Sequence, residues 1–554
     1  MKIALAQLNY HIGNFASNTE KIRSNILRAK KEGADLVVFA ELCVCGYPPR
    51  DFLEFSDFIS RCDEALKDIA SVCNGIAAIV GAPAKNPKVE GKNLFNAAYV
   101  LAEGKIKSVH HKGLLPNYDV FDEYRYFEPA KEFHIAEIAG KKIALTICED
   151  LWDVEEDLMY TQWPMDELIK QKPDLMINIA ASPFSADHAE MRRVVLKHNV
   201  EKYRLPLFYV QHVGAQTELI FDGGSMVLNE KGEIACEMSY FSEDFRIIDT
   251  KGISNIEYRT PNIEMDKSAI GNRQSAISLI HDALVLGIKD YFSKMGFTKA
   301  ILGLSGGVDS ALVLALAVRA LGKENVLSVL MPSEFSSQHS IDDSVALCKN
   351  LDCKYEIVPI KDGFEAMTKT LSPVFKNAAF NVAEENIQAR LRAMILMGIA
   401  NKFGYILLNT TNKSEAAVGY GTLYGDMCGG ISVIGDVYKM QVYEMCKLIN
   451  SEKEIIPENI LTKAPSAELR PNQKDTDSLP EYDILDTILF EYIEKRQGPK
   501  ELVAMGFEKN LVDRILKMVN SNEWKRAQMA PVLRVSSKAF GSGRRMPIVG
   551  KYLG

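Results

Sequence analysis

The chain has 554 residues, of which 47% are hydrophobic and 25% charged, as in an ordinary soluble globular protein. This length exceeds the size at which one hydrophobic core keeps growing, so we expect at least two domains. A formal net charge of −8 argues against bulk nucleic-acid binding. No apolar run approaches the roughly 20 residues of a membrane span, and Met1–Leu8 fits a buried strand better than a signal peptide. Ten scattered cysteines suggest reduced thiols, so we expect a cytoplasmic enzyme.

The first part of the chain alternates short strand-like and helix-like stretches, and we predict one domain over residues 1–250. Apolar stretches predict strands at 36–40, 77–81, 142–147 and 174–179. Turn residues predict two hairpins, 96–109 turning at Glu103-Gly104 and 225–236 turning at Lys231-Gly232. Amphipathic stretches predict helices that cover the strands at 18–33, 56–73 and 187–203.

The pattern becomes polar and irregular over residues 251–273, with Pro261 and Gly271, and we place a linker there. The second domain, residues 274–554, is predicted to begin with a helix through Phe292. Strand–helix alternation follows, which is typical of a doubly wound, Rossmann-like parallel sheet. Beyond about residue 451 the pattern is helical and rich in loops, and the chain ends in a basic tail.

The most informative segment is Ser305-Gly306-Gly307-Val308-Asp309-Ser310. It lies between an apolar strand pattern, 299–304, and an apolar helix start, 311–318. A strand, a glycine turn and a helix N-terminus together direct several backbone N–H groups at one anion. The Asp309 charge would repel a phosphate unless a divalent cation bridges the two. The segment resembles the pyrophosphate loop of the N-type ATP pyrophosphatases, which implies adenylylation of a substrate oxygen by ATP.

Three chemically reactive residue types follow predicted strands of the first domain. Glu41 follows 36–40, Lys112 follows the first hairpin, and Cys148 follows 142–147. Adjacent strand ends converge, so a carboxylate, an ammonium and a thiol could meet there. Glu41 would then act as general base to Cys148 and later as acid to the leaving ammonia. Lys112 would hold the oxyanion and favour the thiolate.

The blocks around these residues resemble the nitrilase superfamily, at Ala40-Glu41-Leu42, Lys112 to Phe127 and Ile147-Cys148-Glu149-Asp150. The resemblance covers nearly the whole first domain and implies an αββα sandwich that hydrolyses carbon–nitrogen bonds of amides. It also implies a glutamine site, in which His188 stands where relatives commonly have lysine; its residues would be Tyr118, Glu123, Ser182 and His188.

A glutamine-hydrolysing domain joined to an adenylylating domain implies an amidotransferase. Lys2 rather than a cysteine follows Met1, and no Gly-x-Cys-x-Gly elbow is present, so we do not expect either of the two glutaminase classes that need these features. The remaining combination resembles the glutamine-dependent NAD synthetases. Further blocks of that family match 384–392, 409–415, 419–426, 436–440 and 465–475, although Thr411 stands where glycine is more common.

This resemblance assigns the residues of the second site. ATP would be bound by Gly303, Leu304, Ser305, Gly306, Gly307, Val308, Asp309, Ser310, Thr410 and Lys439. Deamido-NAD would be bound by Asn386, Arg390, Glu415 and Lys538, and Mg²⁺ by Asp309 and Glu415. The reaction implied is amidation of deamido-NAD to NAD, with L-glutamine as the nitrogen source and AMP and pyrophosphate as products. The resemblance also implies a homo-oligomer, and we expect a closed route for ammonia between the sites.

Three other functions remain open at this stage. The acceptor could be another carboxylate, such as a cobalamin-like acid. The first domain could be a catalytically dead nitrilase fold retained for assembly, although Glu41, Lys112 and Cys148 are all present. The chain could also be an RNA-thiolating or lysidine-forming enzyme with the same pyrophosphate loop, which the acidic balance disfavours.

Overall fold

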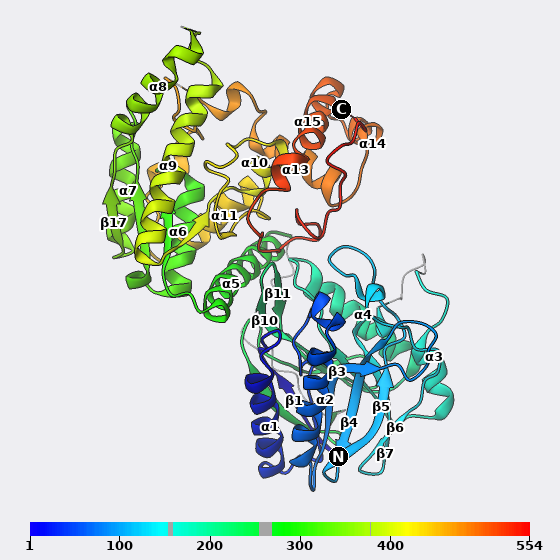
Figure 1. The fold of residues 1–554 in the computed structure, drawn as a ribbon. Helices are drawn as coiled ribbons and strands as arrows, with labels where there is room; N and C mark the ends of the chain where they lie inside the picture. The colour runs from blue at the N-terminus through cyan, green and yellow to red at the C-terminus, as the bar shows by residue number, and fades with distance from the viewer. Residues whose placement is uncertain (153–158, 254–268, 377, 472, 554) are drawn as a thin grey trace. The chain divides into compact units, whose positions relative to one another are not determined.

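The computed structural model describes residues 1–152, 159–253, 269–376, 378–471 and 473–553, with only the backbone for 269–275. The chain divides into two compact units, 1–267 and 268–554 (Figure 1). Most of the predicted linker, 251–273, lies outside the described residues, so the predicted domain bounds remain predictions. Among the described residues, no helix is long and apolar enough to cross a membrane.

The first unit contains two six-stranded sheets, and the predicted αββα class is confirmed. The first sheet has the order β14 (Asp244–Asp249), β1 (Lys2–Gln7), β2 (Leu36–Val38), β3 (Ala77–Lys85), β4 (Leu94–Ala102), β5 (Lys105–His111). The second has the order β13 (Ile234–Glu237), β12 (Met226–Leu228), β9 (Leu207–Gln211), β8 (Leu175–Ala180), β7 (Lys141–Ile147), β6 (Ala136–Ile138). A separate two-stranded sheet pairs β10 (Val213–Gln216) with β11 (Leu219–Asp222).

Helices cover the outer faces of the sandwich (Figure 1). The first sheet is covered by α1 (Phe15–Lys31) and α2 (Ser56–Ser71), and the second by α3 (Pro164–Leu168) and α4 (His188–Tyr203). Short 3₁₀ turns occur at η1 (Arg50–Glu54), η2 (Glu123–Arg125), η3 (Cys148–Leu151) and η4 (Ile169–Gln171). The predicted strands, helices and hairpins of this unit therefore all exist, with ends that differ by a few residues.

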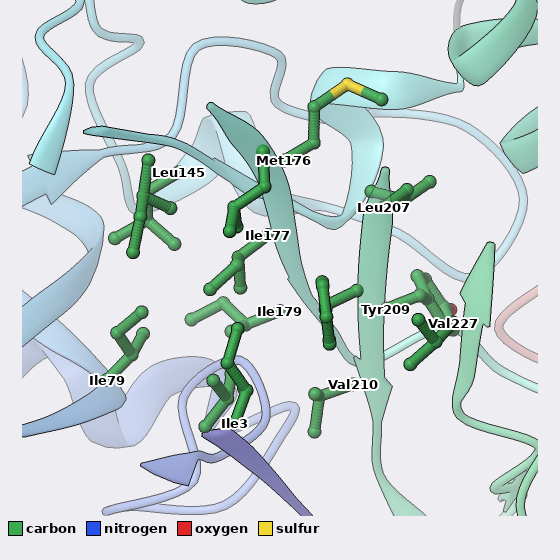
Figure 2. Close-up of a cluster of buried hydrophobic side chains, with 14 of the residues drawn as sticks. Ile3, Ile79, Leu145, Met176, Ile177, Ile179, Leu207, Tyr209, Val210 and Val227 are labelled. Carbon is green, nitrogen blue, oxygen red and sulfur yellow. The ribbon is translucent and has the colours of Figure 1, made fainter. Parts of the chain in front are cut away.

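Alternating side chains of the strands form two apolar layers. On β1, Ile3 and Leu5 belong to the core between the sheets, whereas Ala4 and Ala6 belong to the layer under α1 and α2. Figure 2 shows Ile3 and Ile79 of the first sheet near Ile177, Ile179 and Val210 of the second. Both faces of the strands are buried, which explains their nearly continuous apolar sequence. Each fully buried isoleucine stabilises the fold by about 1.5–3 kcal/mol.

The second unit is built on a five-stranded, all-parallel sheet, as the Rossmann-like prediction required. Its order is β17 (Lys354–Ile357), β16 (Val326–Leu330), β15 (Ala300–Gly303), β18 (Ile406–Asn409), β19 (Ile431–Ser432). Strand order reverses between β15 and β18, and in such sheets ligands bind beyond the carboxyl ends of the strands at this point. The pyrophosphate-loop segment begins at the end of β15.

The helices of the second unit surround this sheet and then form a helical C-terminal part (Figure 1). Those in and around the sheet are α5 (Ala269–Met295), α6 (Val308–Leu321), α7 (Gln338–Asn350), α8 (Lys361–Phe375), α9 (Val382–Phe403), α10 (Lys413–Val418) and α11 (Lys439–Ile449). The later ones are α12 (Glu458–Thr462), α13 (Tyr482–Ile493), α14 (Pro499–Ala504), α15 (Lys509–Ser521) and α16 (Glu523–Arg526). The first helix starts earlier than predicted, at Ala269.

Candidate active sites

The structure brings Glu41 and Lys112 into direct contact. Glu41 follows β2 and Lys112 follows β5, both in the first sheet. Lys112 Nζ lies 2.7 Å from Glu41 Oε1, and both side chains are fully buried. Gly81 on the neighbouring β3 lets the main chain around Glu41 lie close to that strand, because a Cβ at position 81 would lie 2.4 Å from the Leu42 backbone nitrogen. The main chain that carries Glu41 is therefore pressed directly against β3.

Lys112 also contacts a second carboxylate. Its Nζ lies 2.9 Å from both Oε1 and Oε2 of Glu123. The Tyr47 hydroxyl donates to Glu123 Oε1 at 2.9 Å. Glu41 in turn accepts the backbone N–H of Ala181 at 2.9 Å. One buried ammonium thus lies between two buried carboxylates.

This arrangement perturbs the acid–base properties of Glu41 and Lys112. Burial raises the pKa of Glu41 to about 7, with Lys112 opposing the rise and Glu123 adding to it. Burial alone lowers the pKa of Lys112, but the charges of Glu123 and Glu41 outweigh it and hold that pKa well above its ordinary value. Glu41 is therefore poised to exchange a proton near neutral pH, while Lys112 stays charged.

Cys148 begins η3 directly after β7, in a left-handed backbone conformation with φ of 43°. Its thiol pKa lies well above the ordinary value because burial and the Glu41 charge outweigh the opposing effect of Lys112. Lys112 thus acts in the predicted direction, but it does not produce a resting thiolate. The geometry instead requires that a base remove the thiol proton when substrate is present.

Asp150 joins the segments that carry Lys112 and Cys148. Its Oδ1 accepts the N–H groups of Gly113 at 2.9 Å and Leu114 at 2.8 Å. Its Oδ2 accepts the N–H of Ile147 at 3.0 Å. The sequence analysis quoted Asp150 within a family block but gave it no role, because two of its backbone partners, Gly113 and Leu114, lie in another segment.

Glu149 is a further residue that the sequence analysis did not select. Its carboxylate accepts hydrogen bonds from the Tyr118 hydroxyl at 2.9 Å and the Tyr160 hydroxyl at 3.1 Å. Burial raises its pKa to about 7, and Lys112 and the two tyrosines oppose the rise. The sequence feature that could have identified Glu149 is its position directly after the predicted nucleophile, Cys148. A buried carboxylate next to Cys148 suits a positively charged substrate group.

Ser182 and His188 also lie together. Ser182 Oγ and His188 Nε2 are 2.7 Å apart, and the His188 ring stacks on Trp152 with centroids 4.7 Å apart. Gln211 fixes Ser182 by accepting its N–H at 2.9 Å and donating to its carbonyl at 2.6 Å. Of the predicted glutamine contacts, Tyr118 thus lies with Glu149, Ser182 lies with His188, and Glu123 lies apart from them on Lys112.

The second unit contains a cavity of about 570 Å³ at the carboxyl end of its sheet. All predicted ATP-binding residues line it: Gly303, Leu304, Ser305, Gly306, Gly307, Val308, Asp309, Ser310, Thr410 and Lys439. Gly306 has φ of +79°, and a Cβ there would lie 2.6 Å from the carbonyl oxygen of Ser340. Within the loop, the Oγ atoms of Ser305 and Ser310 are 3.2 Å apart. Only glycine fits at position 306.

The predicted metal ligands Asp309 and Glu415 share one lysine. Lys439 Nζ lies 2.5 Å from Asp309 Oδ2 and 3.5 Å from Glu415 Oε1, and Asn412 donates to Asp309 Oδ1 at 2.9 Å. Burial, then the Asp309 charge, raises the pKa of Glu415 to about 8, and Lys439 opposes the rise. A divalent cation would relieve this repulsion.

These residues fit Mg²⁺ bound together with a nucleotide. Among the described residues, no cluster of three or more His, Cys, Asp or Glu side chains could hold a metal ion. Mg²⁺, however, commonly takes only one or two protein carboxylates and completes its shell with phosphate oxygens and water. Asp309 and Glu415 are such a pair, so magnesium remains a prediction that the donor set supports.

Three of the predicted deamido-NAD residues line the same cavity: Asn386, Arg390 and Glu415. Lys538 is absent from the described lining, and its carbonyl accepts the Nζ of the buried Lys413 at 3.0 Å. Its assignment to the nicotinate end stays a prediction. Lys525, which the sequence analysis did not select, does line the cavity and donates to the Gly419 carbonyl at 2.8 Å.

Comparisons with known proteins agree with the two sites. Residues 2–252 match the carbon–nitrogen hydrolase family, and residues 280–529 match the NAD synthase family. The chain thus combines a carbon–nitrogen hydrolase with an NAD synthase.

Similarity to whole proteins is more specific. The chain is 46% identical to glutamine-dependent NAD(+) synthetase from Synechocystis sp., over 99% of this chain and 98% of that protein. It is 40% identical to the enzyme of that name from Acinetobacter baylyi, with 99% and 98% covered. The solved structure of glutamine-dependent NAD+ synthetase from Acinetobacter baumannii in complex with adenosine diphosphate matches with a TM-score of 0.77, at 38% identity, over 99% of this chain and 98% of that one. The chain therefore belongs to the glutamine-dependent NAD(+) synthetase family.

Proposed function

We propose that the first unit hydrolyses L-glutamine to glutamate and ammonia, and that the second uses ATP and this ammonia to convert deamido-NAD to NAD. The observation that carries the first half is the buried Glu41–Lys112 pair at 2.7 Å, together with Cys148. The second half is supported by the cavity that contains the glycine loop and the Asp309–Lys439 pair. Family membership joins the two halves into one reaction.

In the glutaminase reaction, Glu41 removes the proton from Cys148 Sγ, and the sulfur attacks the carbonyl carbon of the glutamine side-chain amide. The oxyanion that forms is stabilised by the Lys112 ammonium. Glu41 then returns the proton to the nitrogen, the carbon–nitrogen bond breaks, and ammonia leaves a thioester on Cys148. Water deprotonated by Glu41 attacks the thioester, so that glutamate and the free thiol are released.

The remaining residues of the first site are suited to the amino-acid end of glutamine. Glu149, held by Tyr118 and Tyr160, would pair with the α-ammonium group. Ser182 and His188 would donate hydrogen bonds to the α-carboxylate. Selection for glutamine over simple amides would follow, because an amide without these charged groups leaves the buried Glu149 unpaired.

In the synthetase reaction, a nicotinate carboxylate oxygen attacks the α-phosphate of ATP and pyrophosphate leaves. Backbone N–H groups of the 305–310 loop and Lys439 would bind the departing pyrophosphate. Asp309 and Glu415 would hold Mg²⁺, which supplies charge neutralisation for the phosphates. Ammonia then attacks the carbonyl carbon of the adenylate and expels AMP, which leaves the amide of NAD.

Ammonia transfer, assembly and location follow as parts of the same proposal. Free ammonia at neutral pH is mostly ammonium, a poor nucleophile, so we infer that glutamine nitrogen reaches the second site without mixing with the solvent. Complete mixing of labelled glutamine nitrogen with added ammonium would contradict this.

We further propose a homo-oligomer, to be checked by sedimentation, and a reducing, cytoplasmic location, which suits ten free cysteines.

The decisive experiment compares two nitrogen sources with Mg-ATP and deamido-NAD. Wild-type protein should make NAD from either glutamine or ammonium. Cys148→Ala should lose the glutamine reaction by at least about a thousandfold and keep the ammonium reaction. Unchanged glutamine-supported synthesis in Cys148→Ala would remove the nucleophile assignment. Absence of NAD from both sources in folded wild-type protein would show that the acceptor is wrong.

A further inference from the structure

Asn96, on β4, contacts the glutaminase residues at several points. Its Nδ2 donates to Glu41 Oε1 at 2.7 Å and to Glu123 Oε2 at 3.3 Å. Its backbone carbonyl accepts the N–H of Lys112 at 2.8 Å. One buried residue thus contacts both carboxylates and fixes the main chain of the lysine that lies between them.

The partners of Asn96 dictate how its amide is oriented. Ionised carboxylates only accept hydrogen bonds, so the NH₂ group must face Glu41 and Glu123. This orientation leaves Asn96 Oδ1 buried and without a hydrogen-bond partner among the described residues. Leaving a buried carbonyl oxygen unpaired destabilises the folded protein. If position 96 only had to be filled, a leucine of similar size would fill it without leaving a buried carbonyl unpaired.

We propose that Asn96 is a positioning residue of the glutaminase: it holds Glu41 and Glu123 in place around Lys112 and keeps Glu41 in the charged form that accepts the proton of Cys148. This inference rests on the glutaminase activity proposed above. A hydrogen bond from a neutral donor stabilises the ionised carboxylate and so opposes the burial that raises the pKa of Glu41 to about 7.

Other groups also act on the charge of Glu41. They are Lys112, Glu123 and Cys148, which surround it in the site, together with Tyr47 and Tyr209. A substitution at position 96 replaces none of these side chains, although it also removes the hydrogen bond that Asn96 donates to Glu123. A change in the titration of Glu41 in such a variant therefore reports the lost amide, provided that the site keeps its structure.

The test is the pH dependence of glutamate release, measured as kcat/KM from about pH 6 to about pH 9, which reports groups of the free enzyme. In the wild type, the acid limb should have its midpoint near the pKa of Glu41, about 7. Asn96→Leu should move this midpoint to higher pH. A shift of about one unit would lower kcat/KM roughly fivefold at pH 7 and leave it near the wild-type value at pH 9.

Asn199→Leu is the matched control. Asn199 is also buried in the first unit, but its Nδ2 donates only to the backbone carbonyls of Leu151 and Val195, both at 2.9 Å. This variant should lose some stability and keep the wild-type midpoint. Ammonium-supported NAD synthesis in each variant shows that the second unit is intact, and thermal unfolding reports the first.

Asn96→Asp supplies a second variant of the same size if Asn96→Leu does not fold. Its carboxyl group should move the midpoint upward as well, because it replaces a donor with an acceptor. An unchanged midpoint, with activity lowered equally at every pH or not at all, would overturn the inference. If the wild type itself releases no glutamate, the proposed function fails instead, and the two failures are thereby distinguished.

Discussion

The buried triplet of Lys112, Glu41 and Glu123 makes the first unit sensitive to loss of one charge. Lys112→Met keeps the length of the side chain but leaves two carboxylates without their cation, at positions 0% and 6% exposed. Removing one partner of a buried ion pair typically costs 3–5 kcal/mol, here about 4 kcal/mol. Since about 1 kcal/mol shifts the melting temperature of a unit of this size by roughly 2–4 °C, we expect a loss of about 8–16 °C at pH 8.

Calorimetry of the full chain at several pH values tests the cause as well as the size. In the variant, the pKa of Glu41, which burial already raises to about 7, is raised further because the opposing charge of Lys112 is gone. The protonated form of Glu41 is therefore favoured by folding: stability is fully present below the unfolded pKa and is lost as pH rises through the folded pKa. The deficit should shrink toward pH 5. Replacing Glu41 and Glu123 by glutamine in the same chain should recover much of it.

A surface ion pair gives the matched control. Lys141 lies 3.0 Å from Asp174, but both side chains are about two-fifths exposed, at 43% and 38%. Lys141→Met should therefore change stability by less than about 1 kcal/mol. If Lys112→Met melts within about 2 °C of the wild type at pH 8, the charge argument is refuted.

The remaining predictions concern binding. Gly306→Ala places a Cβ against the Ser340 carbonyl and strains a φ of +79°. The KM for ATP should therefore rise roughly tenfold or more while glutamate release is unchanged. An unaffected KM would mean that the loop tolerates a side chain. Glu149→Gln removes the charge that would pair with the glutamine ammonium, so the KM for glutamine should rise roughly 10- to 100-fold. A fall in kcat alone would show that Glu149 has a different role. Lys525→Met should raise the KM for deamido-NAD about tenfold, as measured with ammonium as nitrogen source, and no change would exclude Lys525 from that site.

Much of the fold could be predicted because the signals are local. Alternating and continuous apolar stretches marked the strands, and Glu103-Gly104 marked a hairpin whose two residues adopt φ of 52° and 72°. The pyrophosphate loop was equally local, since a strand, two glycines and a helix start are adjacent in sequence. The order of the strands in each sheet was not predicted, because pairing joins segments such as β1 and β14 that lie at opposite ends of the first unit.

The candidate sites divide in the same way. The sequence by itself determined the family, the fold class and the reactive residue types at strand ends, among them Glu41, Lys112 and Cys148. Only the tertiary structure showed the hydrogen bonds that Asn96 and Asp150 make with these residues and their neighbours, and that Lys525 lines the second cavity. It also decided the direction in which the pKa of the Cys148 thiol is shifted, which is upward, because burial and the Glu41 charge outweigh the nearby ammonium. Residue chemistry is written along the chain, whereas desolvation and hydrogen bonding depend on which distant segments enclose a group.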